Sequence, residues 1–158
     1  MRTIAHISDL HFGRVDPVVA DGLLADLKSL APNLTIISGD FTQRAKSEEY
    51  ASAADYVRQI PSPCLIVPGN HDIPLWDFIS RFFRPLAKYR RYMSRDLRPV
   101  FEDDEILVMG INTARPFTWD WDGFWKDGRI SAEQLIDIRL NACRLPGSIF
   151  KIVVTHHP

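Results

Sequence analysis

Short apolar runs alternate with longer amphipathic stretches along the 158 residues of the chain. This alternation is typical of an α/β fold. Runs rich in Val, Ile and Leu predict strands at Thr3–Ser8, Leu34–Ser38, Cys64–Val67, Ile106–Asn112 and Ile149–Thr155. The stretches between them repeat apolar residues every three or four positions, which predicts helices that pack one face against the strands.

The helical stretches also carry start and stop signals. Two series predict buried helical faces: Val19, Leu23, Leu27 and Leu30, and further along Leu135, Ile138, Ala142 and Leu145. A helix is also expected over residues 47–60. Ser131 and Gln134 form a capping box, so the helix that carries Leu135 should begin there and end before Pro146. Pro85 interrupts a helical pattern from Asp77 to Ser94, which predicts two short helices.

Composition narrows the class of protein. With 46% hydrophobic and 25% charged residues, the chain suits one globular domain over residues 1–158 and not a disordered or fibrous protein. Its formal net charge of −1 gives no global reason to bind nucleic acid or a membrane surface. Cys64 and Cys143 lie among apolar residues, which argues against a disulfide framework or a thiolate zinc site. No signal peptide or membrane span is evident, so we expect a cytoplasmic location.

Histidine is the most informative residue type. The chain has five histidines, and four directly follow predicted strands: His11, His71, His156 and His157. Acidic and amide side chains share these segments, which read Asp9-Leu10-His11, Gly39-Asp40 and Gly69-Asn70-His71-Asp72. Ligands of α/β sheets bind beyond the carboxyl ends of the strands. We therefore expect four loops to converge on one pocket.

The residue types in this pocket suit metal ions. Carboxylate, amide and imidazole donors without thiolates favour manganese, iron or zinc, and their number allows more than one ion. Alternation along an extended backbone would place Asp9 and His11 on the same side, so that both bind one ion. Gly39 and Gly69 allow the backbone to approach closely there.

These motifs, together with His156, resemble the calcineurin-like metallophosphoesterase superfamily over essentially the whole chain. Their spacing is most similar to that of bacterial class III cyclic-nucleotide phosphodiesterases and glycerophosphodiesterases. The resemblance implies a β-sandwich flanked by helices (αββα) and two divalent ions (Mn, Fe or Zn). It implies that Asp9 and His11 bind the first ion, Asp40 bridges both, and Asn70 and His156 bind the second. It also implies that His71 is an outer-sphere catalytic acid.

The chain departs from the family pattern in two places. Gln43 stands near the position of a second acid that is not usually a ligand, so its effect should be small. The family's Gly-His-x-His motif and final strands are missing, because the chain stops at Pro158. We therefore interpret it as the N-terminal portion of a metallophosphoesterase domain, truncated at the C-terminus. Weaker metal binding is expected, and the chain should form a homo-oligomer or another association that covers the missing region.

Other features allow two interpretations each. Motif analogy favours His156 over His157 as the ligand, and His6 is expected to be a packed core histidine. Arg115 is a candidate to bind substrate phosphate or an ordinary surface residue. Seven basic residues lie in the segment from Arg81 to Arg98. They either guide an anion or form a solvated helix face, and we favour the solvated face. An aromatic loop from Pro116 to Gly128 either stacks on a nucleobase or covers a core edge.

The leading hypothesis is an enzyme that hydrolyses phosphoesters with two metal ions. A small phosphodiester, such as a cyclic nucleotide or a glycerophosphodiester, is the favoured substrate. Other phosphoesters or pyrophosphates are alternatives, because the metals treat phosphoryl groups alike and loops set specificity. The alternative from another functional class is a non-catalytic interaction scaffold of the same fold. If the chain is an enzyme, we expect its truncated form to be weakly active or inactive.

Overall fold

A computed structural model describes residues 2–75, 77–115 and 128–157. Its first sheet contains β1 (Ile4–Ile7), β2 (Leu34–Ser38) and β3 (Cys64–Val67), ordered β1-β2-β3 and all parallel. Its second sheet contains β4 (Val100–Glu102), β5 (Ile106–Gly110) and β6 (Phe150–Val154), ordered β4-β5-β6. β4 is antiparallel to β5, whereas β6 is parallel to it. The carboxyl ends of β1, β2 and β3 therefore lie at one edge of the first sheet.

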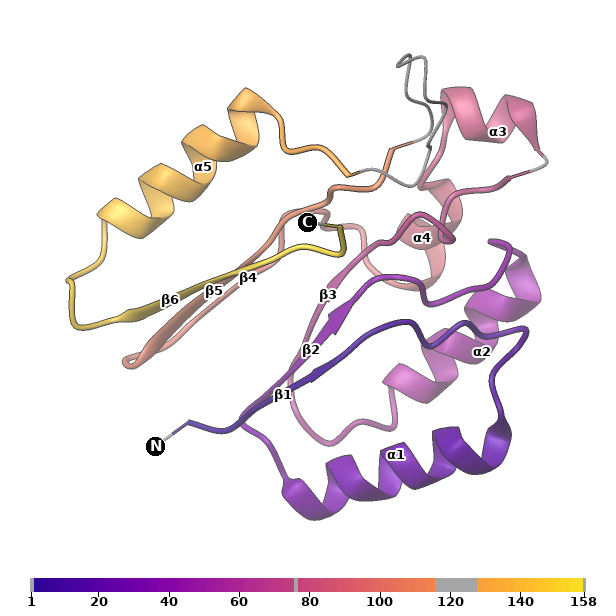
Figure 1. The fold of residues 1–158 in the computed structure, drawn as a ribbon, viewed down its shortest axis with the longest axis horizontal. Helices are drawn as coiled ribbons and strands as arrows, with labels where there is room; N and C mark the ends of the chain where they lie inside the picture. The colour runs from indigo at the N-terminus through magenta and orange to yellow at the C-terminus, as the bar shows by residue number, and fades with distance from the viewer. Residues whose placement is uncertain (1, 76, 116–127, 158) are drawn as a thin grey trace.

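The two sheets pack face to face. Their shared apolar cluster contains residues of both, namely Leu34, Ile36, Leu65, Val67, Ile106, Val108 and Val154. A Cβ on Gly110 would lie 2.6 Å from Val67 Cγ1, so glycine permits the close approach of β5 to β3. α1 (Pro17–Leu30) and α2 (Ser47–Val57) lie on the outer side of the first sheet, and α5 (Ala132–Cys143) lies along the second (Figure 1). The predicted αββα architecture is confirmed.

Two local predictions about helix ends are also confirmed. The helical segment breaks at Pro85 into α3 (Phe78–Phe83) and α4 (Ala87–Tyr92). The capping box forms at the start of α5, where Ser131 Oγ accepts from Gln134 N at 3.2 Å and Gln134 Oε1 accepts from Ser131 N at 2.8 Å. These features depend on neighbouring residues alone, which is why the sequence predicts them.

The predicted buried faces of the helices are partly wrong. On α1, Leu27 is buried, but Val19 and Leu30 are 66% and 55% exposed. Leu24 is buried beside Leu27 instead, so the helix packs through a face rotated away from Val19. On α5 no residue is buried, and Leu135 belongs to an exposed apolar set with Ile136 and Leu140. Periodicity identifies an apolar stripe, whereas the neighbouring sheet decides how much of it is covered.

β4 was not predicted, because its three residues are too few to establish an alternating pattern. The predicted strands near β1, β5 and β6 each extend one or two residues beyond the observed ends. Among the described residues, no helix has both the length and the apolar character needed to cross a membrane.

Candidate metal centre

The loops that follow β1 and β2 run side by side. Asp9 N donates to Gly39 O at 3.1 Å, and His11 N donates to Asp40 O at 2.9 Å. These bonds continue the pairing of β1 with β2 beyond the ends of both strands. They bring the Asp-x-His motif against the Gly-Asp motif.

Three residues of these loops have left-handed backbone conformations. Their φ angles are 57° at Asp9, 46° at His11 and 55° at Asp40. Such a conformation costs a non-glycine residue about 1 to 3 kcal/mol and is concentrated at functional sites. The expected extended backbone is therefore wrong, because the side chains of Asp9 and His11 are brought together by turns. Their predicted proximity is nevertheless observed.

Asp9, His11 and Asp40 offer ligand atoms that all lie within 4.8 Å of one another. His11 Nε2 lies 3.5 Å from Asp9 Oδ1 and 3.7 Å from Asp40 Oδ2. Two ligands of one tetrahedral ion, each about 2.1 Å from it, lie about 3.4 Å apart. The spacing of these atoms therefore suits a shared ion better than direct hydrogen bonds.

Asp40 occupies the middle of the cluster and is buried. Its Oδ1 accepts the backbone N–H of His71 at 2.9 Å, while its Oδ2 lies 3.4 Å from His156 Nε2. Burial raises the pKa of this carboxyl group, but His156 and the His71 N–H outweigh burial, so the pKa is lowered. Asp40 is thus held as a carboxylate with one oxygen directed at imidazoles from two loops.

His156 comes from the loop after β6 and is oriented by the first sheet. Its Nδ1 donates to Ser38 O at 2.6 Å, which directs Nε2 to Asp40. Burial lowers the pKa of His156. The hydrogen bonds with Asp40 and Ser38 and the charge of Asp40 outweigh this effect and raise the pKa to about 9. A ligand histidine commonly donates its second N–H to a backbone carbonyl. His156 has this arrangement.

Asn70 is buried and contacts the second histidine of the terminal pair. His157 Nε2 donates to Asn70 Oδ1 at 3.0 Å. The buried Thr113 accepts the His157 N–H at 3.3 Å, and its hydroxyl lies 3.2 Å from His157 Nδ1. His157, treated as a bystander in the sequence, therefore positions Asn70. Only the contact between the segment that follows β6 and the loop after β3 reveals this role.

His71 lies beside the cluster, with its ring perpendicular to that of His11 and the centroids 4.9 Å apart. Its Nδ1 donates to the backbone oxygen of Gln43 at 2.9 Å. The backbone at this position thus orients the imidazole, and the Gln43 side chain is not needed for that contact.

Asp72 ties the loops after β2 and β3 together. Its fully buried carboxylate accepts backbone N–H groups of Gly69 at 2.9 Å, Thr42 at 3.0 Å and Phe41 at 3.3 Å. Burial raises the pKa of Asp72 to about 6 against the opposing effect of these donors. Because Gly69 and Thr42 flank the ligand motifs, Asp72 fixes the loop after β3 relative to the loop after β2.

The remaining candidates are dispersed. His6 is exposed and its Nε2 lies 2.8 Å from Ser38 Oγ, so the expected core position is wrong, because β1 is an edge strand of the sheet. Arg115 follows the buried Ala114 and is partly buried. Residues 116–127 of the aromatic loop lie outside the described residues.

A family model described as calcineurin-like phosphoesterase matches residues 2–158. The chain belongs to this family. The resemblance to this family that the sequence motifs indicated is therefore confirmed.

Two curated members of the calcineurin-like phosphoesterase family are similar to the chain. A probable cyclic nucleotide phosphodiesterase of Synechococcus sp. is 32% identical over 170 residues, which cover 99% of this chain and 58% of that protein. The glycerophosphodiester phosphodiesterase GpdQ of Enterobacter lignolyticus is 32% identical over 122 residues, which cover 70% of this chain and 43% of that protein. The chain thus spans less than two thirds of the length of each relative.

Two solved structures share the fold of this family member. Phosphopantetheinyl hydrolase (PptH) from Mycobacterium tuberculosis superposes with a TM-score of 0.53 at 19% identity, covering 99% of this chain and 68% of that chain. TT1561 of Thermus thermophilus superposes with a TM-score of 0.55 at 18% identity, covering 96% and 66%. At this identity the likeness concerns the fold alone.

Calcineurin-like phosphoesterases use divalent metals, and the donor set of this chain fits them. The donors are oxygens and imidazole nitrogens, as divalent manganese, iron and zinc accept. In the described part of the chain, the buried Nδ1 of His11 has no hydrogen-bond partner. Its other ring nitrogen, Nε2, is the one that lies near the Asp9 and Asp40 carboxylates.

Proposed function

We propose that this chain hydrolyses phosphoesters at a centre of two divalent metal ions and favours small phosphodiesters, such as a cyclic nucleotide or a glycerophosphodiester. The observation that carries the proposal is the position of Asp40 Oδ2, 3.7 Å from His11 Nε2 and 3.4 Å from His156 Nε2. A carboxylate between two imidazoles from different loops has the position that a bridging ligand requires. The printed names of the two curated relatives support a phosphodiester substrate.

The proposal assigns each candidate ligand to one or both metal ions. Asp9 and His11 hold the first ion, Asn70 and His156 hold the second, and Asp40 holds both. Two such ions supply a nucleophile at neutral pH and neutralise phosphate charge. The chain keeps the ligands in place through the Ser38 carbonyl behind His156 and through His157 behind Asn70.

His71 is the proposed acid for the leaving oxygen. Its Nδ1 donates to the Gln43 carbonyl whether the ring is neutral or charged, so proton exchange takes place at Nε2. The perpendicular ring of His11 keeps this imidazole beside the ligands. A positioned proton donor of this kind accounts for about 10²-fold to 10⁴-fold in rate.

The test combines metal content with hydrolysis. The purified chain is loaded with Mn²⁺, Fe²⁺ or Zn²⁺, bound metal per chain is measured, and bis(p-nitrophenyl) phosphate, cyclic nucleotides and phosphomonoesters are assayed. We expect two ions per chain and faster hydrolysis of diesters than of monoesters. Asp40→Ala should lose both ions and the activity, because it removes the ligand shared by the two.

Asp16→Ala is the matched control, since Asp16 caps α1 by accepting from Val18 N and has no part in the cluster. It should retain both ions. Loss of only one ion in Asp40→Ala would contradict bridging. A wild-type chain that binds no metal and hydrolyses none of these compounds would favour the scaffold alternative.

A further inference from the structure

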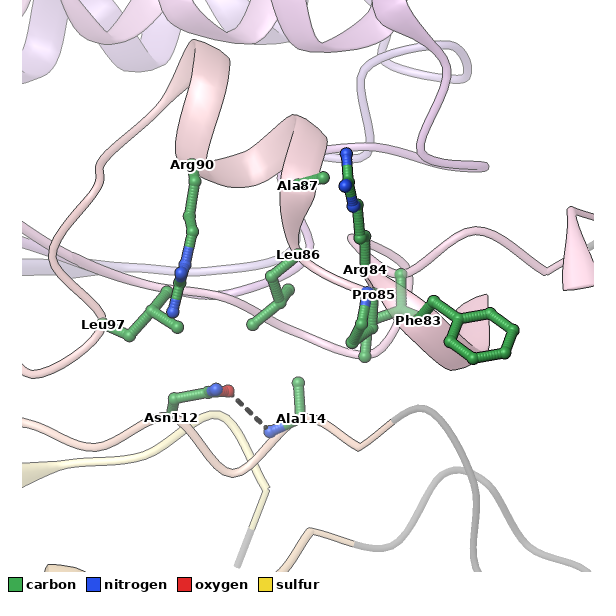
Figure 2. Close-up of a pocket in the computed structure, with 10 residues that line it drawn as sticks. Phe83, Arg84, Pro85, Leu86, Ala87, Arg90, Leu97, Asn112 and Ala114 are labelled. Carbon is green, nitrogen blue, oxygen red and sulfur yellow. Dashed lines mark hydrogen bonds between the residues drawn. The ribbon is translucent and has the colours of Figure 1, made fainter. Parts of the chain in front are cut away.

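A cavity of about 660 Å³ lies between the α3–α4 segment and the end of β5 (Figure 2). This volume is within the usual range for small-molecule sites. Its walls include the apolar side chains of Ile73, Leu86, Leu97 and Ala114. The cavity is therefore large enough to hold the organic part of a small ester.

The cavity borders the candidate metal centre. Ile73 in its wall donates its backbone N–H to Asn70 O at 3.2 Å. Ala114, also in the wall, adjoins Thr113, which holds His157 against Asn70. Two walls of the cavity are thus continuous with the supports of Asn70. The cavity therefore lies next to the residues that position Asn70.

The cavity presents polar donors and no acid among the described residues that line it. Figure 2 shows Arg90 extending from α4 toward Asn112, whereas the guanidinium of Arg84 extends away from Asn112. Asn112 Oδ1 accepts from Ala114 N at 3.0 Å, which leaves its amide nitrogen as a donor. A guanidinium beside an amide donor and apolar walls is suited to a carboxylate or a phosphate.

Arg84, Arg90 and Arg95 differ from the other four basic residues of the segment from Arg81 to Arg98, and of these three only Arg90 both lines the cavity and extends toward Asn112. Arg81 donates to Pro74 O at 3.2 Å, and Lys88 donates to Ala45 O at 2.9 Å. Arg98 pairs with Glu133 on α5, and the Arg91 guanidinium lies 5.4 Å from the centroid of the Tyr92 ring. These four make intramolecular contacts. Within the described residues, the Arg90 guanidinium has no hydrogen bond or ion pair, so its charge is available to a ligand.

We propose that the cavity holds the non-reacting substituent of the substrate and that Arg90 binds a second anionic group on it. The favoured substrates are then phosphoesters whose substituent carries a carboxylate or a further phosphate. This inference rests on the proposed function and narrows its substrate class. Arg90 acts in specificity, because it contacts the substituent and not the reacting phosphoryl group.

The first experiment compares two chromogenic diesters with the metal-loaded chain. Each is a p-nitrophenyl phosphodiester of a short alkyl chain, ending in a carboxylate in one and in the uncharged carboxamide in the other. We expect Arg90→Gln to lower kcat/KM for the carboxylate substrate about 10-fold to 100-fold, and to change the carboxamide value less than about twofold. Arg91→Gln, one residue away and outside the cavity wall, should change neither value. Equal effects of Arg90→Gln on both substrates would overturn the inference.

The second experiment does not depend on activity. With EDTA present, phenylphosphonate is titrated into the labelled chain while amide NMR shifts are followed. We expect shifts at Asn112 and Ala114 that Arg90→Gln abolishes and Arg91→Gln retains. Shifts elsewhere only, or no shifts, would overturn the inference. If the wild-type chain hydrolyses neither diester with any metal, the proposed function fails, and this titration still decides whether the cavity binds anions.

Discussion

The two sheets of the sandwich differ in how completely they are enclosed. The first sheet packs against α1 and α2 through buried residues such as Leu27 and Tyr50. The second sheet lies beside α5, none of whose residues is buried, and its edge strand β6 exposes Phe150 and Val153. Most proposed ligands lie on loops of the enclosed sheet. The open sheet supplies His156 and His157, both held by hydrogen bonds to residues outside β6.

This difference shows that the positions of the candidate ligands depend more on individual hydrogen bonds than on how deeply the neighbouring sheet is buried. Asp72 links three backbone groups of the enclosed side, and Thr113 and Ser38 hold the two histidines of the open side. The apolar surface of α5 and β6 agrees with the expectation of association. That association stays a prediction.

The largest effect is expected from His71→Ala. It removes the proton at Nε2 but no proposed ligand, so kcat should fall about 10²-fold to 10⁴-fold while bound metal is unchanged. Steady-state kinetics and metal analysis measure both quantities. Gln43→Ala is the control, because the Gln43 backbone oxygen holds the ring, and it should retain activity. Metal loss in His71→Ala would make His71 a ligand.

A pair of leucine substitutions tests the comparison between the sheets directly. Leu27→Ala on α1 should cost about 2 to 5 kcal/mol of unfolding free energy, because it opens a cavity in the enclosed core. Leu140→Ala on α5 should change it by less than about 0.5 kcal/mol, since that side chain is exposed. Denaturant unfolding at two protein concentrations measures both. A large cost at Leu140 that grows with protein concentration would show that α5 is covered in an oligomer.

Asp72→Asn tests the tie between the loops of the enclosed sheet. The amide keeps one acceptor oxygen and places an NH₂ group against backbone N–H donors, so unfolding free energy should fall by about 1 to 3 kcal/mol. Metal affinity should fall as well. Asp77→Asn, which alters the cap of α3, should leave metal affinity unchanged. Calorimetric titration gives the affinities, and unchanged affinity in Asp72→Asn would refute the tie.

The smallest effect is expected at the open sheet. His157→Ala removes the donor that holds Asn70 Oδ1, so the affinity for one ion should fall about 10-fold to 100-fold while the other is retained. Titration of the metal-free chain separates the two affinities. The exposed His6 offers a matched histidine control, and His6→Ala should alter neither. Loss of both ions in His157→Ala would mean that His157 supports the whole centre.

Much of the fold was predictable because its signals are local. β2 and β3 coincide with the predicted ranges, the helix breaks at Pro85, and α5 begins after Ser131. Each signal comes from the chemistry of a few adjacent residues. The short β4 and the rotated face of α1 were missed, because neighbouring elements determine both.

The sequence by itself determined which candidate ligand residues the chain carries and where they lie along it. Asp9, His11, Asp40, Asn70, His71 and His156 were selected from their residue types and their places after strands, and the family match agrees with those motifs. Only the tertiary structure decided that Asp72 binds backbone groups of two loops, that His157 holds Asn70, and that Arg90 faces a cavity. The physical reason is the sequence separation of the residues involved. Ligand type and strand ends are local properties, whereas hydrogen bonds across 30 to 118 residues and a space between two segments exist only after the sheets have packed.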